Sequence, residues 1–200
     1  MANAVPKLIA YRVLRPAVSG PEPVHMVCRE DNAEQLATAL ATHALDVVIA
    51  DAPAPPHVRV KVFNHVLGES DTAFFAPPAL ASRLRRRFPA SLHGTPMLLP
   101  TASAAMRRAL DAWFDKEGLH PVVTGEFEDS ALMKVFAQGT GVAFPAPAVI
   151  ADDVCRFYGV RLVGRTPAVR ERYYAISAER RVRHPGVLAI TNAARDELFA

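Results

Sequence analysis

The stretch Gly125–Pro147, GEFEDSALMKVFAQGTGVAFPAP, changes character three times within 23 residues. An acidic turn at 126–129 ends one strand and leads into a compact apolar helix over 130–138. Gly139 and Gly141 are expected to end that helix, because glycine accepts the left-handed conformation that closes helices. The following VAFPA is too apolar to face water on either side, which is typical of a buried strand. The stretch therefore predicts a strand–helix–strand unit of an α/β fold.

The same alternation of short β-branched strands and amphipathic helices continues on both sides of this stretch, as in α/β proteins with mostly parallel sheets. Helices are expected over 6–15, from Asp31 to Ala44, over 79–88, 103–117, 130–138 and 147–158, and from Pro185 to the end. Strands are expected over 24–28, 45–51, 58–69, 72–78, 96–100, 121–127, 142–146, 160–163 and 172–177.

Local signals place the ends and faces of these helices. Asp31 followed by Glu34 predicts a capping box, and Pro16 is expected to stop the first helix. Ser130 is expected to cap the helix that follows the acidic turn, and Leu132, Met133 and Phe136 are expected to bury one of its faces.

The pattern divides into two lobes, each a mostly parallel sheet flanked by helices. Residues 1–68 and 170–200 are expected to form lobe I, and residues 69–169 lobe II. Two crossover strands would join them, near 67–72 and 165–173. This two-lobed architecture is similar to that of type-2 periplasmic binding proteins, in which the ligand cleft lies between the lobes, where strand ends meet helix starts.

Composition excludes several classes of protein. No apolar run in the 200 residues approaches the length needed to cross a bilayer, and Lys7, Arg12 and Arg15 interrupt the N-terminal apolar stretch, which argues against a secretion signal. A cytoplasmic protein without a membrane partner is expected. Cys28 and Cys155 lie in apolar surroundings without a neighbouring Cys or His at ligand spacing, so we expect two buried free thiols.

Arginines cluster in SRLRRRF at 82–88 and in the stretch 165–184, although the formal net charge is only +3. Such clusters could contact nucleic acid, but a DNA-binding face usually carries a recognition helix or stacking aromatics and a larger positive charge. In 82–88 the arginines alternate with Leu84 and Phe88 at helical spacing. We therefore favour the solvated side of an amphipathic helix.

Motifs for known chemistry are missing. The sequence holds no nucleophile elbow, P-loop, zinc-protease motif, Cys-x-x-Cys pair or dinucleotide fingerprint, so no cofactor is expected. None of the seven histidines lies three or four residues from another, which leaves a zinc site unsupported. Carboxylate clusters at 30–31, 126–129 and 152–153 could share a proton or bind a cation. Each also lies at a helix start, where negative charge complements the helix dipole, and we favour that interpretation.

Two helix starts carry small hydroxyls after a strand, namely Thr101 and Ser103 in PTASAAM and Ser130 in EDSALM. The free N–H groups of a first helical turn bind anions or carboxylates when they face a cleft. The same hydroxyls could be ordinary N-caps, and the sequence leaves both interpretations open.

Several stretches together resemble the C-terminal effector-binding domain of LysR-type transcriptional regulators: VCRED, LDVVIADAPAP, FNHVLGES, FFAPPALASRLRRRFPASLHGTPMLLPT, ALDAWFDKEG, GEFEDSALMKVFAQGTGVAFPAP and GRTPAVRERYYAISAERRVRHP. GEFEDSALM and RERYYAISAERR are most similar to a subgroup of activators that control sodium/proton antiporters in response to sodium or alkaline stress. The resemblance implies a regulatory domain without catalysis that senses a small-molecule or cation effector. DNA would be bound only through an N-terminal winged helix-turn-helix that this chain does not contain.

The resemblance also implies a site and a partner. Carried over by position, the ligand-binding residues are Pro6, Lys7, Thr101, Ser103, Asp129, Ser130, Phe144 and Pro145. Regulatory domains of the family pair antiparallel, which here implies a homodimer through residues 7–15 and 130–138.

Two other functions share the expected architecture. A prephenate dehydratase would carry a Thr-Arg-Phe motif at the cleft, and that tripeptide does not occur here. A free-standing solute-binding protein would need export, and no signal for export is visible.

Overall fold

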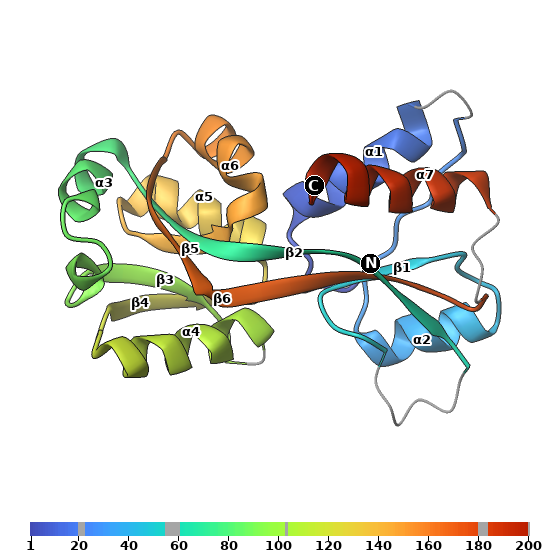
Figure 1. Ribbon diagram of the computed structural model, residues 1–200, viewed down its shortest axis with the longest axis horizontal. Coiled ribbons are helices and arrows are strands. Elements are labelled where there is room, and N and C mark those ends of the chain that lie inside the picture. Colours follow the sequence, from blue (N-terminus) through green and yellow to red (C-terminus); the bar gives the residue numbers. More distant parts are fainter. Residues whose placement is uncertain (20–22, 55–60, 103, 180–183, 200) are drawn as a thin grey trace. The chain divides into compact units, whose positions relative to one another are not determined.

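The computed structural model describes residues 1–19, 23–54, 61–102, 104–179 and 184–199 (Figure 1). The expected α/β composition is confirmed. The chain forms two compact units: unit 1 comprises Met1–Glu69 and Arg172–Ala200, and unit 2 comprises Ser70–Glu171. Each unit is described by itself.

Unit 1 is built around two neighbouring helices and one short buried strand. Its elements are α1 (Lys7–Ser19), α2 (Ala33–Ala41), β1 (Val48–Ala50) and α7 (Pro185–Ala193), which continues into a π-helical turn, Ala194–Leu198. Helices α1 and α7 lie side by side (Figure 1). Val13 of α1 and Ile190 of α7 are buried between the elements of this unit. Strand β1 is buried along its whole length and pairs antiparallel with β6 (Arg161–Ser177).

Two long strands, β2 (Phe63–Ala76) and β6, each run from one unit into the other. The sequence predicts separate strands over 58–69 and 72–78 and over 160–163 and 172–177, but each pair is one continuous strand, at the positions where crossover strands are expected. A Cβ placed at Gly68 would lie 2.2 Å from the Phe199 side chain. Gly164 is crowded in the same way, with Phe88 at 2.5 Å. These glycines allow a close approach of side chains to a strand, and they do not turn the chain.

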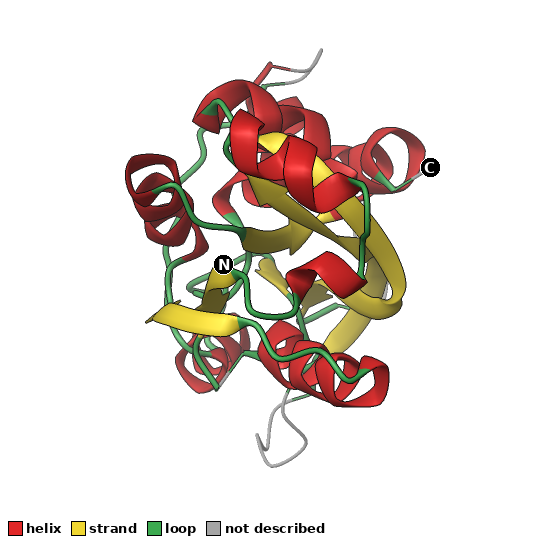
Figure 2. Cartoon of the chain, turned by 90° about the vertical axis from the view of Figure 1, so that its left-hand side faces the viewer, coloured by secondary structure: helices red, strands yellow, loops and turns green. Residues whose placement is uncertain are grey.

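Unit 2 contains the strand–helix–strand unit expected from Gly125–Pro147. Its elements are α3 (Pro78–Arg85), a 3-10 turn (Ala90–Leu92), β3 (Pro96–Pro100), α4 (Ala105–Glu117), β4 (Val122–Phe127), α5 (Ser130–Thr140), β5 (Phe144–Pro147), a second 3-10 turn (Ala148–Ile150) and α6 (Ala151–Tyr158). Strands β3 and β4 are parallel. Helix α4 covers one side of this pair and α5 the other (Figure 1), so that helices lie on both sides of the strands (Figure 2).

The core of unit 2 is rich in aromatic rings. Phe74 of β2 lies 5.6 Å from Trp113 and 6.2 Å from Phe114, both of α4, measured between ring centroids. Leu110 and Met97 complete this cluster and are fully buried. Because such rings bury large apolar areas, they dominate the packing energy of a small domain.

The expectation of mostly parallel sheets is only partly correct. Among the described strands, β3–β4 is parallel, whereas β1–β6 and β2–β5 are antiparallel. The sheet that contains the long strands has the order β1-β6-β2-β5. The long strands oppose their short neighbours in direction, which alternation of strands and helices along the chain does not reveal.

Several local predictions also need correction. Pro16 lies inside α1, and the helix continues to Ser19 because Ala17 is packed in the core. Asn32 caps α2 by accepting a hydrogen bond from the Gln35 N–H at 3.0 Å, so Asp31 is not the cap. The strand predicted over 24–28 is wrong, because these residues belong to no sheet.

The two cysteines are free, as predicted, but neither is fully buried. Cys28 is exposed because the segment 24–28 has no strand beside it, and Cys155 is half-buried on α6. The exposed arginines at 83 and 85–87 confirm the solvated helix side predicted for 82–88. None of the described helices is long and apolar enough to span a bilayer.

Candidate functional site

The carboxyl ends of β3 and β4 bring three of the predicted site residues to one edge of unit 2. Thr101 follows β3, while Asp129 and Ser130 follow β4. The Thr101 N–H donates a hydrogen bond to the Phe127 carbonyl oxygen at 3.1 Å, which ties the two strand ends together. Ligands of α/β proteins commonly bind beyond the carboxyl ends of parallel strands, so this edge is the candidate site.

Asp129 controls the beginning of α5. Its Oδ1 accepts hydrogen bonds from the Ala131 N–H at 2.6 Å and the Leu132 N–H at 3.3 Å. Asp129 is therefore the N-cap, and the prediction that Ser130 caps this helix is wrong. The carboxylate occupies the N–H groups that an anion would use, and its negative charge repels anions. The edge consequently favours a cation or a neutral hydroxyl or amide group over an anionic ligand.

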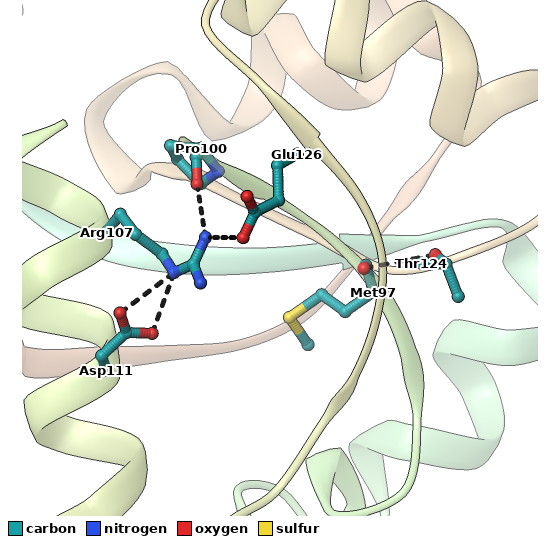
Figure 3. Close-up of polar contacts among 6 residues, drawn as sticks. All are labelled: Met97, Pro100, Arg107, Asp111, Thr124 and Glu126. Atoms are coloured by element: carbon teal, nitrogen blue, oxygen red, sulfur yellow. Dashed lines mark hydrogen bonds and ion pairs between the residues drawn. The ribbon is translucent and has the colours of Figure 1, made fainter. Parts of the chain in front are cut away.

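Arg107, in the first turn of α4, holds the same edge in place (Figure 3). Its Nε lies 2.9 Å and 3.0 Å from the two carboxylate oxygens of Asp111. Its Nη1 donates to the Pro100 carbonyl oxygen at 2.9 Å and pairs with Glu126 of β4. Arg107 thus connects α4 with the ends of both parallel strands.

The electrostatics of this clamp favour the charged guanidinium. Burial lowers the pKa of Arg107, but its hydrogen bonds to Glu126 and Asp111 outweigh that effect and raise the pKa above its usual value. The side chain is only 14% exposed, so solvent screens these contacts incompletely. Arg107 remains charged, and the Glu126 carboxylate is fixed at the strand end.

Lys134 of α5 is a buried ammonium group. The residue is 2% exposed, and its Nζ donates a hydrogen bond to the Ser130 carbonyl oxygen at 2.8 Å. Burial lowers the pKa of Lys134 to about 8, against the opposing influence of the Glu171 and Asp129 carboxylates. Lys134 therefore loses its charge near pH 8, and its contact with the first turn of α5 depends on pH in that range.

Tyr158 of α6 responds to the same carboxylate. Burial raises the pKa of the Tyr158 hydroxyl, and the negative charge of Asp129 raises it further. Asp129 therefore influences both a buried ammonium group and a phenol, in addition to capping α5. A change in its charge or position would affect all three.

The solvent-facing side of α5 is apolar, contrary to expectation. Leu132 and Phe136 are each 48% exposed and Val135 is 55% exposed, whereas the buried face carries Met133 and Lys134. The prediction that Leu132 and Phe136 are buried is wrong. The stripe is rotated because Lys134 takes a core position, and Phe136 lies instead against Phe127 at 5.0 Å between ring centroids.

The remaining predicted site residues belong to other segments of the chain. Phe144 and Pro145 are buried in β5, where Phe144 stacks on Phe75 at 5.6 Å. Pro6 and Lys7 belong to unit 1; Pro6 is buried and Lys7 forms an ion pair with Glu30. Ser103 lies outside the described residues.

Arg107 and Lys134 were not singled out from the sequence. The Arg107–Asp111 spacing of four residues was visible as a helical ion pair, but nothing in it indicated Glu126 as a third member. Lys134 could have been noticed as a charge on an apolar helix face. Among the described residues, no group of three or more His, Cys, Asp or Glu side chains is arranged to hold a metal ion.

Comparison with known proteins agrees with this architecture. Residues 12–199 match the family described as LysR substrate binding domain. The chain belongs to this family. It is a regulatory domain of the transcription-regulator type and not an enzyme, as the sequence resemblance implied.

Individual relatives of this LysR domain support the same assignment. The chain is 35% identical over 202 residues to the transcriptional activator protein NhaR of Escherichia coli (strain K12), and equally to that of Shigella flexneri, covering 100% of this chain. It spans 65% of the length of each of these relatives.

Solved structures share the fold at low sequence identity. The reduced regulatory domain of OxyR2 from Vibrio vulnificus superimposes with a TM-score of 0.68 at 13% identity, covering 97% of this chain and 91% of that one. DarR from Vibrio fischeri, solved in complex with DNA, gives a TM-score of 0.67 at 12% identity, covering 95% of this chain and 64% of that one. The fold of this domain is therefore that of LysR regulatory domains.

Proposed function

We propose that this domain senses an effector and controls a sodium/proton antiporter gene in response to sodium or alkaline stress, as the regulatory part of a cytoplasmic transcriptional activator. The observation that carries the proposal is the 35% identity to NhaR along the whole chain, because it far exceeds the 12–13% identity to regulators that share only the fold. DNA binding would come from a separate winged helix-turn-helix domain, as the family resemblance implies.

The effector is proposed to act at the β3–β4 edge of unit 2, through Thr101, Asp129 and Ser130. The acidic cap of α5 favours a cation or a neutral polar group there, for the electrostatic reason given above. Phe144 and Pro145 would act indirectly, by fixing β5 beneath this edge. Pro6 and Lys7 remain candidates from the family resemblance alone, and Ser103 remains one from the resemblance and from its expected place at a helix start.

Signalling would be a population shift. An effector can move the equilibrium between two arrangements of a domain only by its difference in affinity for them. The first turn of α5 is a suitable place for such a difference, because Asp129 holds its N–H groups and Lys134 bonds the Ser130 carbonyl. A ligand that competes for Asp129 would loosen both contacts.

A homodimer is part of the proposal. Leu132, Val135 and Phe136 form an exposed apolar strip on α5, and Tyr11 of α1 is 52% exposed. Exposed apolar strips on regular helices commonly mark protein interfaces. Pairing of residues 7–15 of one copy with residues 130–138 of another would cover both.

The function can be tested in a chimera, in which this chain replaces the matching segment of E. coli NhaR and a reporter gene follows that activator's target promoter. Sodium chloride or a shift to alkaline pH should induce the reporter several-fold, whereas potassium chloride at equal ionic strength should not. A chimera that accumulates and binds the promoter but never responds to sodium or pH would refute the proposal.

The dimer is tested separately by light scattering of the purified domain. Phe136→Asp should shift the domain from dimer to monomer, since a charge would be buried in the proposed interface. Ala112→Asp, on the exposed side of α4, is the matched control and should leave the dimer intact. A parent domain that is monomeric at micromolar concentration would contradict this part of the proposal.

A further inference from the structure

Two exposed histidines meet at the amino ends of the parallel strands of unit 2. His93 lies in the turn that leads into β3, and His120 lies in the connection between α4 and β4. Their ring centroids are 5.5 Å apart, and the ring planes make an angle of 62°. Helical spacing along the sequence does not reveal this pair, because its members come from two separate connections. Thr101 and Asp129 follow the opposite, carboxyl ends of the same strands.

The backbone fixes the distance between these two connections. The Gly94 N–H donates a hydrogen bond to the His120 carbonyl oxygen at 2.9 Å, and the Val122 N–H donates one to the Thr95 carbonyl oxygen, also at 2.9 Å. Both bonds continue the parallel ladder of β3 and β4. Gly94 has a φ of 69°, the left-handed conformation that glycine adopts without strain, directly after His93. Main-chain contacts therefore hold the two histidines next to each other.

The ring nitrogens of both histidines are available to a ligand. In the part of the chain that the structure describes, neither ring forms a hydrogen bond or an ion pair, and both residues are exposed. A neutral imidazole offers one nitrogen to a metal ion while the other keeps its proton. Because the side chains are exposed, each ring can rotate about its side-chain bonds without displacing core atoms.

The separation of the rings fits a shared metal ion. A ring centroid lies about 3.2 Å from a zinc ion that one of its nitrogens binds at about 2.0–2.1 Å. Two such rings at a tetrahedral angle have centroids about 5.2 Å apart. The observed separation of 5.5 Å is close to this value. Small rotations of the two rings are therefore enough to direct one nitrogen of each toward the same ion.

The type and number of ligands decide which ions are suitable. Imidazole suits zinc, nickel and copper ions, whereas magnesium and calcium ions require oxygen ligands. The described residues hold no group of three or more His, Cys, Asp or Glu that could bind a metal ion, so the pair supplies two ligands. Water or a small molecule would complete the coordination. Such a site binds more weakly than a structural zinc site with four protein ligands.

We propose that His93 and His120 form a binding site for a divalent transition-metal ion at the amino ends of β3 and β4. The bound ion connects the turn before β3 to the segment before β4 and so cross-links the beginnings of both parallel strands. The two rings meet only in the folded domain, so the ion stabilises unit 2 by mass action. The site uses neither Asp129 nor Ser130, and it is therefore independent of the proposed effector site.

The test adds zinc chloride to the purified domain after treatment with a chelator. Calorimetry gives the Kd, and zinc at about 100 times this Kd should raise Tm by about 5 °C or more. The ring protons of His93 and His120 should shift together in NMR spectra during the titration. Magnesium chloride at the same concentration should change neither Tm nor these signals.

Single substitutions identify the ligands. His93→Ala and His120→Ala should each lower the affinity for zinc by about tenfold or more and at least halve the rise in Tm, because each removes one of two protein ligands. Without zinc, both variants should match the parent in Tm, since the rings are exposed. His43→Asn, at an exposed histidine of unit 1, is the matched control and should keep the full rise. Absence of zinc binding, or an equal rise in Tm in the parent and in His120→Ala, would overturn the proposal.

Discussion

Unit 2 and unit 1 differ in how completely their strands are paired. In unit 2, β3, β4 and β5 each have a partner, and an aromatic cluster around Phe74 and Trp113 fills the space beneath them. In unit 1, the segment 24–28 has none, and a groove lies beside it. A strand-like sequence therefore becomes a strand only when a neighbouring strand is present, because the backbone hydrogen bonds of a sheet join one strand to the next.

The largest expected contrast between the units comes from truncating a side chain in each. Trp113→Ala should reduce the free energy of unfolding by about 3–5 kcal/mol, because it opens a cavity in the filled core of unit 2. Val27→Ala, on the unpaired segment of unit 1, should cost less than about 0.5 kcal/mol. Urea denaturation measures both. Similar losses at the two positions would mean that the segment 24–28 is packed far more firmly than its exposure indicates.

Lys134 adds an effect of pH to unit 2. Its folded pKa of about 8 lies below its ordinary value of 10.5, so between these values the unfolded chain binds the proton that the folded chain has lost. Stability should therefore rise as pH increases from about 8 to 10.5, by about 3 kcal/mol at most.

Lys134→Met should remove this rise in stability and make the domain more stable at pH 7. The gain at pH 7 is reduced slightly, because the bond to the Ser130 oxygen is lost. The measurement is the urea midpoint at pH 7, 8.5 and 10. Lys116→Met, at an exposed position on α4, should leave the pH dependence unchanged. If the parent domain shows no gain in stability across this range, the buried ammonium assigned to Lys134 is incorrect.

The smallest effect is expected at the cap of α5. Asp129→Ala should cost about 1 kcal/mol, because the Ala131 and Leu132 N–H groups lose their acceptor. Asp129→Asn keeps a side-chain oxygen that can accept these bonds, so it should cost only roughly 0.3 kcal/mol. Glu128→Ala, next to it in the exposed turn, serves as the comparison, and an equal cost for all three would show that capping contributes nothing here.

The sequence predicted most of unit 2 and less of unit 1, for physical reasons. Gly125–Pro147 carries its own strand, acidic turn, helix and glycine stop, so the order and type of its elements agree with the structure. Its finer signals do not, because Asp129 caps the helix, Leu132 and Phe136 are exposed, and Gly139 lies inside the helix that ends at Gly141. Strand β2 continues through Gly68, because the sequence does not distinguish a glycine that makes room for Phe199 from one that turns the chain. Strand direction in β1–β6 and β2–β5 depends on neighbours distant in sequence, and alternation along the chain carries no information about it.

The candidate site was predictable in part. Thr101 and Asp129 follow strands and precede helices, and the structure places both at the edge where the parallel strands end. Their role in binding stays a prediction. Arg107 was missed because its bonds to Pro100 and Glu126 join residues 7 and 19 positions away. The burial of Lys134 could not be predicted, because a lysine in an apolar helix is expected to point to solvent, whereas this one is buried.

The most direct test of the account is whether the β3–β4 edge of unit 2 carries the response to sodium and alkali. In the NhaR chimera, Asp129→Asn combined with Ser130→Ala should lower the induction ratio by about fivefold, which corresponds to about 1 kcal/mol of coupling. Met26→Ala combined with Val27→Ala, in the unpaired segment of unit 1, should leave the induction ratio within a factor of about 1.5 of the parent value. Full induction in the unit 2 variant, at equal protein level and promoter occupancy, would contradict the account.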